Sequence, residues 1–156
     1  MTLVNLLTPS QIVPRMAATE RWSAIVELVE LLIQVGKIQS ADKDSILAAL
    51  KQREETMSTG IGFGIAIPHA TSERVTEVVA AFGRSLDGIE FESLDNAPVK
   101  FIVLFVVPKN QFQVHLRTLA AIAKLLNDKG VRESLAAAQS SEEILQIFEN
   151  RAGKTG

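Results

Sequence analysis

Apolar side chains recur at three- and four-residue intervals in several stretches, which is the pattern of a helix with one buried face. In the first stretch Gly36 is placed to end the helix. We predict that Thr19 caps this helix, that Ser40 caps the second and that Ser140 or Ser141 caps the last. The predicted helices are Glu20–Gly36, Ala41–Thr56, Gln113–Leu126, Val131–Ala138 and Ser141–Glu149.

Other stretches are typical of strands. Val99–Val107 is continuously apolar apart from one lysine, which predicts a strand buried on both faces. Val78–Arg84 predicts a second strand, and Ile65 with Ile67 a brief third that Pro68 ends. Gln11–Met16 predicts a short edge strand, because Pro14 cannot donate to a central ladder.

Polar turns are predicted at Thr71–Arg74, Asp87–Gly88 and Asp95–Pro98. Trp22 and the phenylalanines are expected in the core, and Ala152–Gly156 is expected to be a loose tail. Helices and strands alternate along the chain. We therefore predict an α/β fold, a three-layer sandwich with a central mixed β-sheet and helices on both sides.

Composition narrows the possible functions. A chain of 156 residues that is 47% apolar predicts one domain over residues 1–156. The net charge of −2 does not favour a nucleic-acid binder, which needs a basic face. The sequence has no apolar run long enough to span a membrane, and we expect neither membrane insertion nor a secretory leader. It has no cysteine, which excludes thiol nucleophiles and fits the cytoplasm.

The stretch Thr56–Ala70 carries the most distinctive candidate chemistry. Its three alternate glycines allow positive φ and offer backbone amides, and it ends at Pro68-His69. We expect His69 to be held rigidly at a strand end. His115, the other histidine, falls in the first turn of a predicted helix, where free amides attract anions. Arg53 precedes the glycines and has the planar fork that suits phosphate.

Each of these residues also has an ordinary structural interpretation. Either histidine could be structural or merely exposed, and Arg53 could be a solvated residue at a helix end. The two histidines could share a metal, but no nearby carboxylate completes a site, so we predict no metal. The glycines lack the spacing of a dinucleotide or P-loop motif, and no G-x-S-x-G occurs. Four acidic residues predict a solvated turn, or else a docking rim for a basic partner: Asp87, Glu90, Glu92 and Asp95.

Two motifs together resemble a known family. Arg53-Glu54, Ser58-Thr59-Gly60-Ile61-Gly62 and Gly64-Ile65-Ala66-Ile67-Pro68-His69 form the first. Leu94-Asp95-Asn96-x-Pro98-Val99, Val107-Pro108 and His115-Leu116-x-x-Leu119 form the second. From about Gln11 to Phe148 the chain resembles the type-2 IIA components of the bacterial phosphoenolpyruvate-dependent phosphotransferase system. This is the fructose/mannitol subfamily, which includes the nitrogen-related regulatory IIA proteins.

The resemblance implies a role for each matching residue. His69 would accept the phosphoryl group, His115 would be the second active-site histidine, and Arg53 would lie beside the phosphoryl group. We add Ser58 and Thr59 as predicted phosphate-binding residues. Phe63 departs from the family, in which a polar residue such as asparagine is common. Its effect at the site is not predicted, and we do not count it as a phosphate contact.

The resemblance also implies partners. A phosphohistidine on a small carrier, HPr- or NPr-like, would donate the group to His69 without cofactor or metal. As a regulatory protein the chain would bind a target according to its phosphorylation state. As a relay it would pass the group to a cysteine on a IIB domain, which must be another domain since this chain has none. The sequence without a fused IIB segment favours regulation, and a degenerate domain without phosphorylation is a third possibility. Neighbouring IIB and IIC genes would favour relay, and a sigma-54-related gene would favour regulation.

Overall fold

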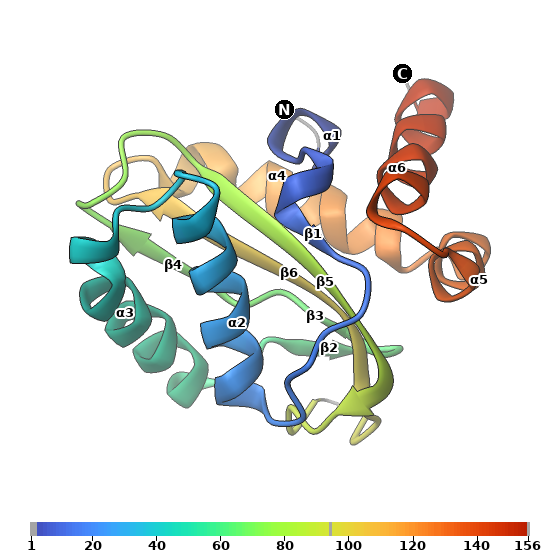
Figure 1. The fold of residues 1–156 in the computed structure, drawn as a ribbon, viewed down its shortest axis with the longest axis horizontal. Helices are drawn as coiled ribbons and strands as arrows, with labels where there is room; N and C mark the ends of the chain where they lie inside the picture. Colours follow the sequence, from blue (N-terminus) through green and yellow to red (C-terminus); the bar gives the residue numbers. More distant parts are fainter. Residues whose placement is uncertain (1–2, 94, 156) are drawn as a thin grey trace.

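The computed structural model describes residues 3–93 and 95–155, with side chains described through Arg151. Leu94 of the second motif and Gly156 of the predicted tail lie outside the described residues. Figure 1 shows the arrangement of the elements. The helices are α1 (Leu3–Leu6), α2 (Arg21–Gln34), α3 (Lys43–Thr56), α4 (Phe112–Leu126), α5 (Lys129–Ala137) and α6 (Ser141–Thr155), with 3-10 turns η1 (Pro9–Gln11) and η2 (Ser40–Asp42). The strands are β1 (Ile12–Val13), β2 (Gly60–Gly62), β3 (Ile65–Ala66), β4 (His69–Ser72), β5 (Val79–Ile89) and β6 (Val99–Pro108).

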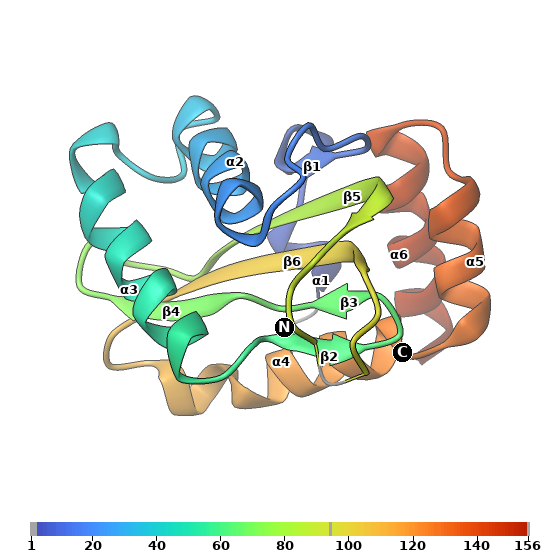
Figure 2. The same ribbon diagram turned by 90° about the horizontal axis from the view of Figure 1, so that it is seen from below.

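These strands form one mixed sheet, which confirms the predicted fold. Its order is β1-β5-β6-β3-β2, and β4 also pairs with β6. Strand β6 runs antiparallel to β5 and parallel to β3 and β4. In Figure 2, α2 and α3 lie on one side of this sheet and α4 lies on the other. The result is three layers with the sheet in the middle.

The sheet has a hydrophobic core on each of its faces. Alternate residues of β6 contribute to each core, because successive side chains of a strand point to opposite faces. Ile102, Leu104 and Val106 pack in the cluster that includes α2 and α3 residues. Phe101, Val103, Phe105 and Val107 pack in the cluster that includes α4, α5 and α6 residues. The prediction that this strand is buried on both faces is therefore confirmed, and β6 is a rigid frame for whatever pairs with it.

Strands β3 and β4 pair with the same edge of β6 in a single register. Ile65 lies opposite Phe101 and His69 opposite Phe105, and the carbonyl of Pro68 accepts a hydrogen bond from Phe105 N at 3.0 Å. The prediction that Pro68 ends the strand is only half right, because pairing resumes at the next residue. His69 therefore begins a strand, and part of the predicted turn Thr71–Arg74 belongs to β4.

The helix boundaries agree well with the sequence pattern, and the caps agree less. Gly36 follows α2 with φ +82°, as expected for a residue that ends a helix. Ser140 accepts from Glu143 N at 3.2 Å, which confirms the cap of α6. Thr19 is not the cap of α2, since Glu20 takes that position with extended backbone. Asp42 replaces Ser40 as the N-cap of α3, because Ser40 instead begins η2.

Two further expectations are wrong. The residues of the predicted tail through Thr155 continue α6 rather than forming a loose end. Asp87–Gly88 is not a turn between elements but part of β5, where the pairing with β6 shifts between Arg84 and Ile89. Gly88 has φ +89° at this irregularity, so the local turn signal marks a break in register within a continuing strand.

Candidate functional site at the start of strand β4

His69 is the first residue of β4, and its ring is half-buried. Its Nδ1 atom lies 2.7 Å from the carbonyl oxygen of Ile67. A carbonyl oxygen can only accept a hydrogen bond, so Nδ1 carries the proton in the neutral ring. The lone pair is then on Nε2. The interruption of strand pairing at Ile67-Pro68 thus directs the carbonyl of Ile67 at the ring, and this contact selects one tautomer of His69.

The surroundings of His69 favour the neutral form. Burial lowers the pKa of His69 below its ordinary value of 6.5, and the positive charge of Arg53 lowers it further. The hydrogen bond to Ile67 and the negative charge of Glu54 act in the opposite direction, and the pKa stays lowered. At neutral pH the imidazole is therefore uncharged and has a nucleophilic nitrogen.

Helix α4 reaches the same site. The ring of Phe112, its first residue, stacks on His69 with centroids 6.2 Å apart and planes 12° from parallel. His115 is one turn further along, and residues three apart share a face of a helix. The His115 side chain is buried, and its Nδ1 has no hydrogen-bond partner among the described residues. A buried polar atom without a partner is costly and indicates a place where a ligand or water belongs.

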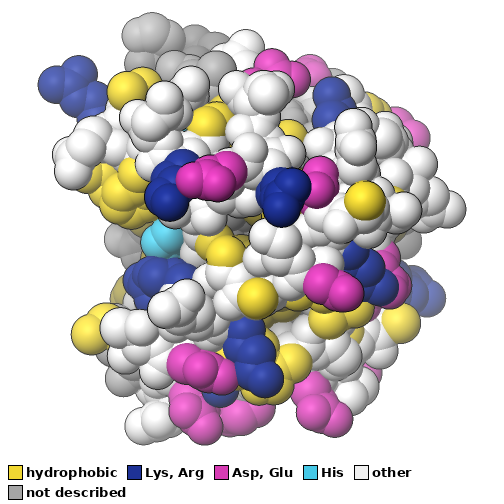
Figure 3. All heavy atoms as spheres, turned by 90° about the vertical axis from the view of Figure 1, so that its left-hand side faces the viewer, with side chains coloured by type: hydrophobic (Ala, Val, Ile, Leu, Met, Phe, Trp, Pro, Cys, Tyr) yellow, Lys and Arg dark blue, Asp and Glu magenta, His cyan; other side chains and the backbone are white. Residues whose placement is uncertain are grey.

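Arg53 lies in the last turn of α3, and its Nη1 donates to the carbonyl of Met57 at 2.8 Å. The side chain is half-exposed and its charge acts on His69. Three elements thus bring Arg53, His69 and the His115 face of α4 to one region of the molecule. Figure 3 shows a histidine on the face viewed from the α3 side, with Lys or Arg side chains and hydrophobic side chains next to it.

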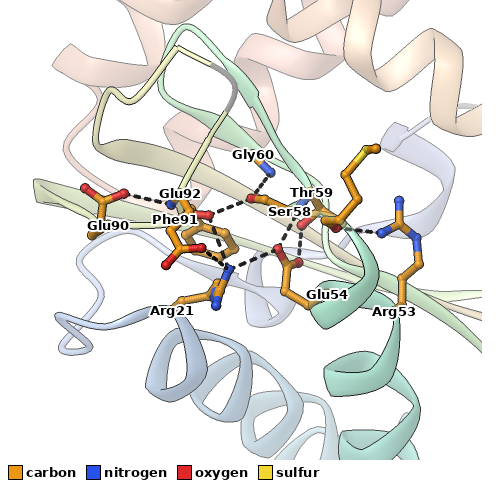
Figure 4. A network of polar contacts seen from close by, with 10 residues as sticks. Arg21, Arg53, Glu54, Ser58, Thr59, Gly60, Glu90, Phe91 and Glu92 are labelled. Atoms are coloured by element: carbon orange, nitrogen blue, oxygen red, sulfur yellow. Dashed lines mark hydrogen bonds and ion pairs between the residues drawn. The ribbon is translucent and has the colours of Figure 1, made fainter.

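Ser58 and Thr59 are already bonded to protein groups. Ser58 Oγ donates to the carbonyl of Phe91 at 2.6 Å and accepts from Gly60 N at 3.0 Å. Thr59 donates its amide to Glu54 at 2.8 Å, and its hydroxyl donates to the same carboxylate. Figure 4 shows these contacts. Either residue would have to give up a hydrogen bond to reach phosphate, so their phosphate-binding role stays a prediction.

The glycine stretch forms the hairpin β2–β3 rather than an open loop. Gly60 is needed because a Cβ there would lie 2.6 Å from the Cβ of Ser93. The amide of Phe63 donates to Asp95 at 3.0 Å. The prediction that this loop offers free amides to phosphate is not supported, because the amides of Gly60 and Phe63 already have protein acceptors.

Phe63 is at the tip of this hairpin. The residue is 62% exposed, and the Arg132 guanidinium lies 4.9 Å from its ring centroid. The expectation that phenylalanines belong to the core is wrong for this residue. The hairpin pairs with β6 at Phe101, four residues before the position opposite His69. At about 3.3 Å per residue, that separation is roughly 13 Å along the strand. The unusual side chain therefore changes the hairpin rather than the surroundings of His69.

The described residues contain no group of three or more acidic or histidine side chains that could hold a metal ion. Within the same residues, no helix is long and apolar enough to cross a membrane. Sequence reasoning did not anticipate the stacking of Phe112 on His69, the carbonyl of Ile67 as its partner, or the buried carboxylate of Glu54. Phe112 begins an amphipathic helix, but only the packing of α4 brings it to His69.

Comparison with known proteins decides the family. The sequence profile described as "Phosphoenolpyruvate-dependent sugar phosphotransferase system, EIIA 2" matches residues 5–151. The chain belongs to this family. The resemblance noted in the sequence is therefore confirmed, and the EIIA 2 family is one of phosphotransferase components.

Individual relatives of this EIIA 2 chain come from both branches of the family. The fructose-specific EIIA component of Haloferax volcanii is 34% identical over 149 residues, which cover 94% of this chain and 95% of that protein. The nitrogen regulatory protein of Escherichia coli is 42% identical over 109 residues, covering 69% of this chain and 67% of that protein. The crystal structure of nitrogen regulatory protein IIA-Ntr from Neisseria meningitidis has a TM-score of 0.84 and 32% identity, covering 94% of this chain and 98% of that one.

Proposed function

We propose that the chain accepts a phosphoryl group on Nε2 of His69 from a phosphohistidine of a small HPr- or NPr-like carrier. The observation that carries this proposal is the hydrogen bond from Nδ1 of His69 to Ile67, which leaves Nε2 as the nucleophile. The lowered pKa keeps that nitrogen unprotonated at neutral pH. Phe112 stacks on the ring and limits its rotation.

The proposed step is an in-line transfer. The bond between phosphorus and the carrier's histidine nitrogen breaks as the bond to Nε2 of His69 forms. The proton stays on Nδ1, where the carbonyl of Ile67 stabilises the positive charge that the ring gains. Arg53 and His115 stabilise the charge on the phosphoryl oxygens. Nδ1 of His115, which has no partner among the described residues, gains one in this step.

The surroundings of the site suit a protein donor. Met57, after α3, is 63% exposed, and Val114, next to His115 in α4, is 69% exposed. Figure 3 also shows hydrophobic side chains next to the histidine on this face. Exposed apolar patches with polar residues around them are typical of surfaces that bind proteins. We expect the carrier to cover these residues during transfer, and we expect this chemistry to take place in the cytoplasm.

We further propose that the output is regulatory, with a target protein that binds according to the phosphorylation state of His69. The 42% identity to the E. coli nitrogen regulatory protein and the fold of the Neisseria IIA-Ntr support this branch. The alternative is a relay to the cysteine of a fructose- or mannitol-type IIB domain. The match to the H. volcanii fructose-specific component over nearly the whole chain favours that alternative.

Two measurements test the proposal. Radiolabelled phosphate from phosphoenolpyruvate, passed through enzyme I and a purified carrier, should label the protein and should not label His69→Ala. Labelling that persists in the variant would contradict the acceptor assignment. Adding a purified fructose-type IIB domain to the labelled protein should leave the label in place. Rapid transfer to the IIB cysteine would instead show a relay.

A further inference from the structure

Glu54 is a buried carboxylate beside the candidate site. Only 2% of the residue is exposed, although it lies in the last turn of α3, whose final residues are exposed. Carboxylates are almost never buried unless their oxygens are satisfied, because the loss of hydration is costly. Both oxygens of Glu54 accept from one residue: Thr59 N donates to Oε2 at 2.8 Å, and Thr59 Oγ1 donates to Oε1. The charge of Glu54 is thus used to hold Thr59.

Arg21 of α2 supplies the counter-charge. Its Nη1 lies 3.9 Å from Glu54 Oε2 and also 3.9 Å from Glu92 Oε2, and it donates to the carbonyl of Phe91 at 3.5 Å. Figure 4 shows Arg21 between the two acids, with Glu54 directed at the Thr59 backbone. At 3.9 Å the ion pair is longer than a hydrogen bond. The strong contacts of Glu54 are therefore those to Thr59, and Arg21 balances the charge.

Arg53 and Glu54 are neighbours in α3, so their side chains leave the helix about 100° apart. Arg53 bonds the carbonyl of Met57, and Glu54 bonds both donors of Thr59. The two residues together hold the first and last residues of the segment 57–59. Between them Ser58 bonds the carbonyl of Phe91, which fixes this segment to the loop after β5.

We propose that Glu54 is a positioning residue for Arg53. It fixes the segment after α3 through Thr59, and the Met57 carbonyl in that segment holds the Arg53 guanidinium in place beside His69. The proposal rests on the function proposed for His69 and Arg53. Glu54 itself does not touch the phosphoryl group. Loss of the Glu54 charge would lower the pKa of His69 further and leave the ring neutral. Substitution of Glu54 should therefore impair transfer by displacing Arg53.

A double-mutant cycle on the phosphorylation rate tests this mechanism. Glu54→Gln keeps the size of the side chain but can accept from only one of the two Thr59 donors without rearrangement. Because small displacements of a binding group strongly reduce rates, we expect a roughly tenfold loss of rate at saturating carrier, with the KM for the carrier unchanged. In the Arg53→Gln background the same substitution should cost less than about twofold, since groups that act as a unit are not additive.

The neighbouring Glu55 provides a matched control. It is exposed and pairs only loosely with Lys51 at 4.0 Å, so Glu55→Gln makes the same change of charge and should leave the rate unaltered. Thr59→Val, which keeps the Glu54 charge and removes one donor, should reproduce part of the loss. Thermal unfolding of each variant confirms that it is folded at the assay temperature.

The outcomes separate this proposal from the one on which it rests. Equal losses for Glu54→Gln in both backgrounds, or no loss in either, would overturn the positioning role while the labelling of His69 still stands. A loss as large in Glu55→Gln would mean that charge alone matters, which also overturns it. If the unaltered protein is not labelled on His69, the proposed function fails and the positioning role fails with it.

Discussion

The substitution Phe63→Asn should stabilise the protein. Phe63 and Gly64 are the two central residues of the β2–β3 hairpin, with φ of +57° and +77°. Positive φ at both positions is the pattern of a type I′ turn, for which Asn-Gly is strongly preferred. A bulky residue rarely adopts this conformation, which costs roughly 1–2 kcal/mol for L-residues other than glycine and, at times, asparagine or aspartate.

Removing the Phe63 ring costs less free energy than the relief of this backbone strain provides. The residue is 62% exposed, so little burial is lost, and the stacking with Arg132 at 4.9 Å is worth about 0.5–1 kcal/mol at an exposed site. The difference between the midpoints of these two ranges is a net gain of about 0.75 kcal/mol in the free energy of unfolding. For a domain of this size that gain corresponds to a rise of roughly 1–4 °C in Tm.

Urea denaturation followed by circular dichroism measures this gain as a higher midpoint with an unchanged slope. Gly64→Ala is the matched control, because its Cβ would meet nothing closer than 3.6 Å and only the backbone conformation is strained. That variant should lose about 1 kcal/mol. A double-mutant cycle with Arg132→Ala isolates the stacking energy. A Phe63→Asn protein that is less stable than the parent would refute the reasoning, since the ring would then outweigh the strain. The phosphorylation rate should not change.

Three further results are expected at the site. His115→Ala should still accept phosphate, more slowly, and pass it on poorly; unaltered onward transfer would remove His115 from the site. Arg53→Gln should slow phosphorylation and raise the pKa of His69 in an NMR titration. The variant should lose less than about 1.5 kcal/mol of stability. A loss of about 2–5 kcal/mol, as for a core truncation, would show that Arg53 has a structural role instead. Because the pKa of His69 is lowered in the folded state, the unfolded chain binds the proton first as pH falls. The stability that His69 contributes should therefore decrease as pH falls through 6.5, and this decrease should stop below the lowered pKa. The phosphorylation rate should also fall as the ring is protonated. A rate or a stability that rises on acidification would contradict this.

The elements were predictable where local pattern decides them. The apolar spacing of α2 and Gly36 after it, the end of α3 at Thr56 and the continuous apolar stretch of β6 all follow from side-chain periodicity and turn residues. The motifs also singled out His69 and Arg53, and the structure brings the two close enough for the charge of Arg53 to act on His69. In each case the information lies within a few consecutive residues, so that it can be seen without tertiary contacts.

The environment of the site was not predictable in this way. Glu54 looks like an ordinary residue of an amphipathic helix, and only the return of the chain at Thr59 buries it. Phe112 meets His69 because β6 brings α4 alongside β4, which no local signal records. The hairpin at Phe63 was not predicted because the local signal is missing: the asparagine typical of such a turn is absent from the sequence.

The position of the phosphorus atom tests the central claim most directly. Nitrogen-15 and phosphorus-31 NMR of the protein, phosphorylated through its carrier with labelled histidine, should show a bond from phosphorus to Nε2 of His69. Nδ1 should keep its proton, because the carbonyl of Ile67 accepts it. Phosphorus on Nδ1 of His69, or on His115, would contradict the account.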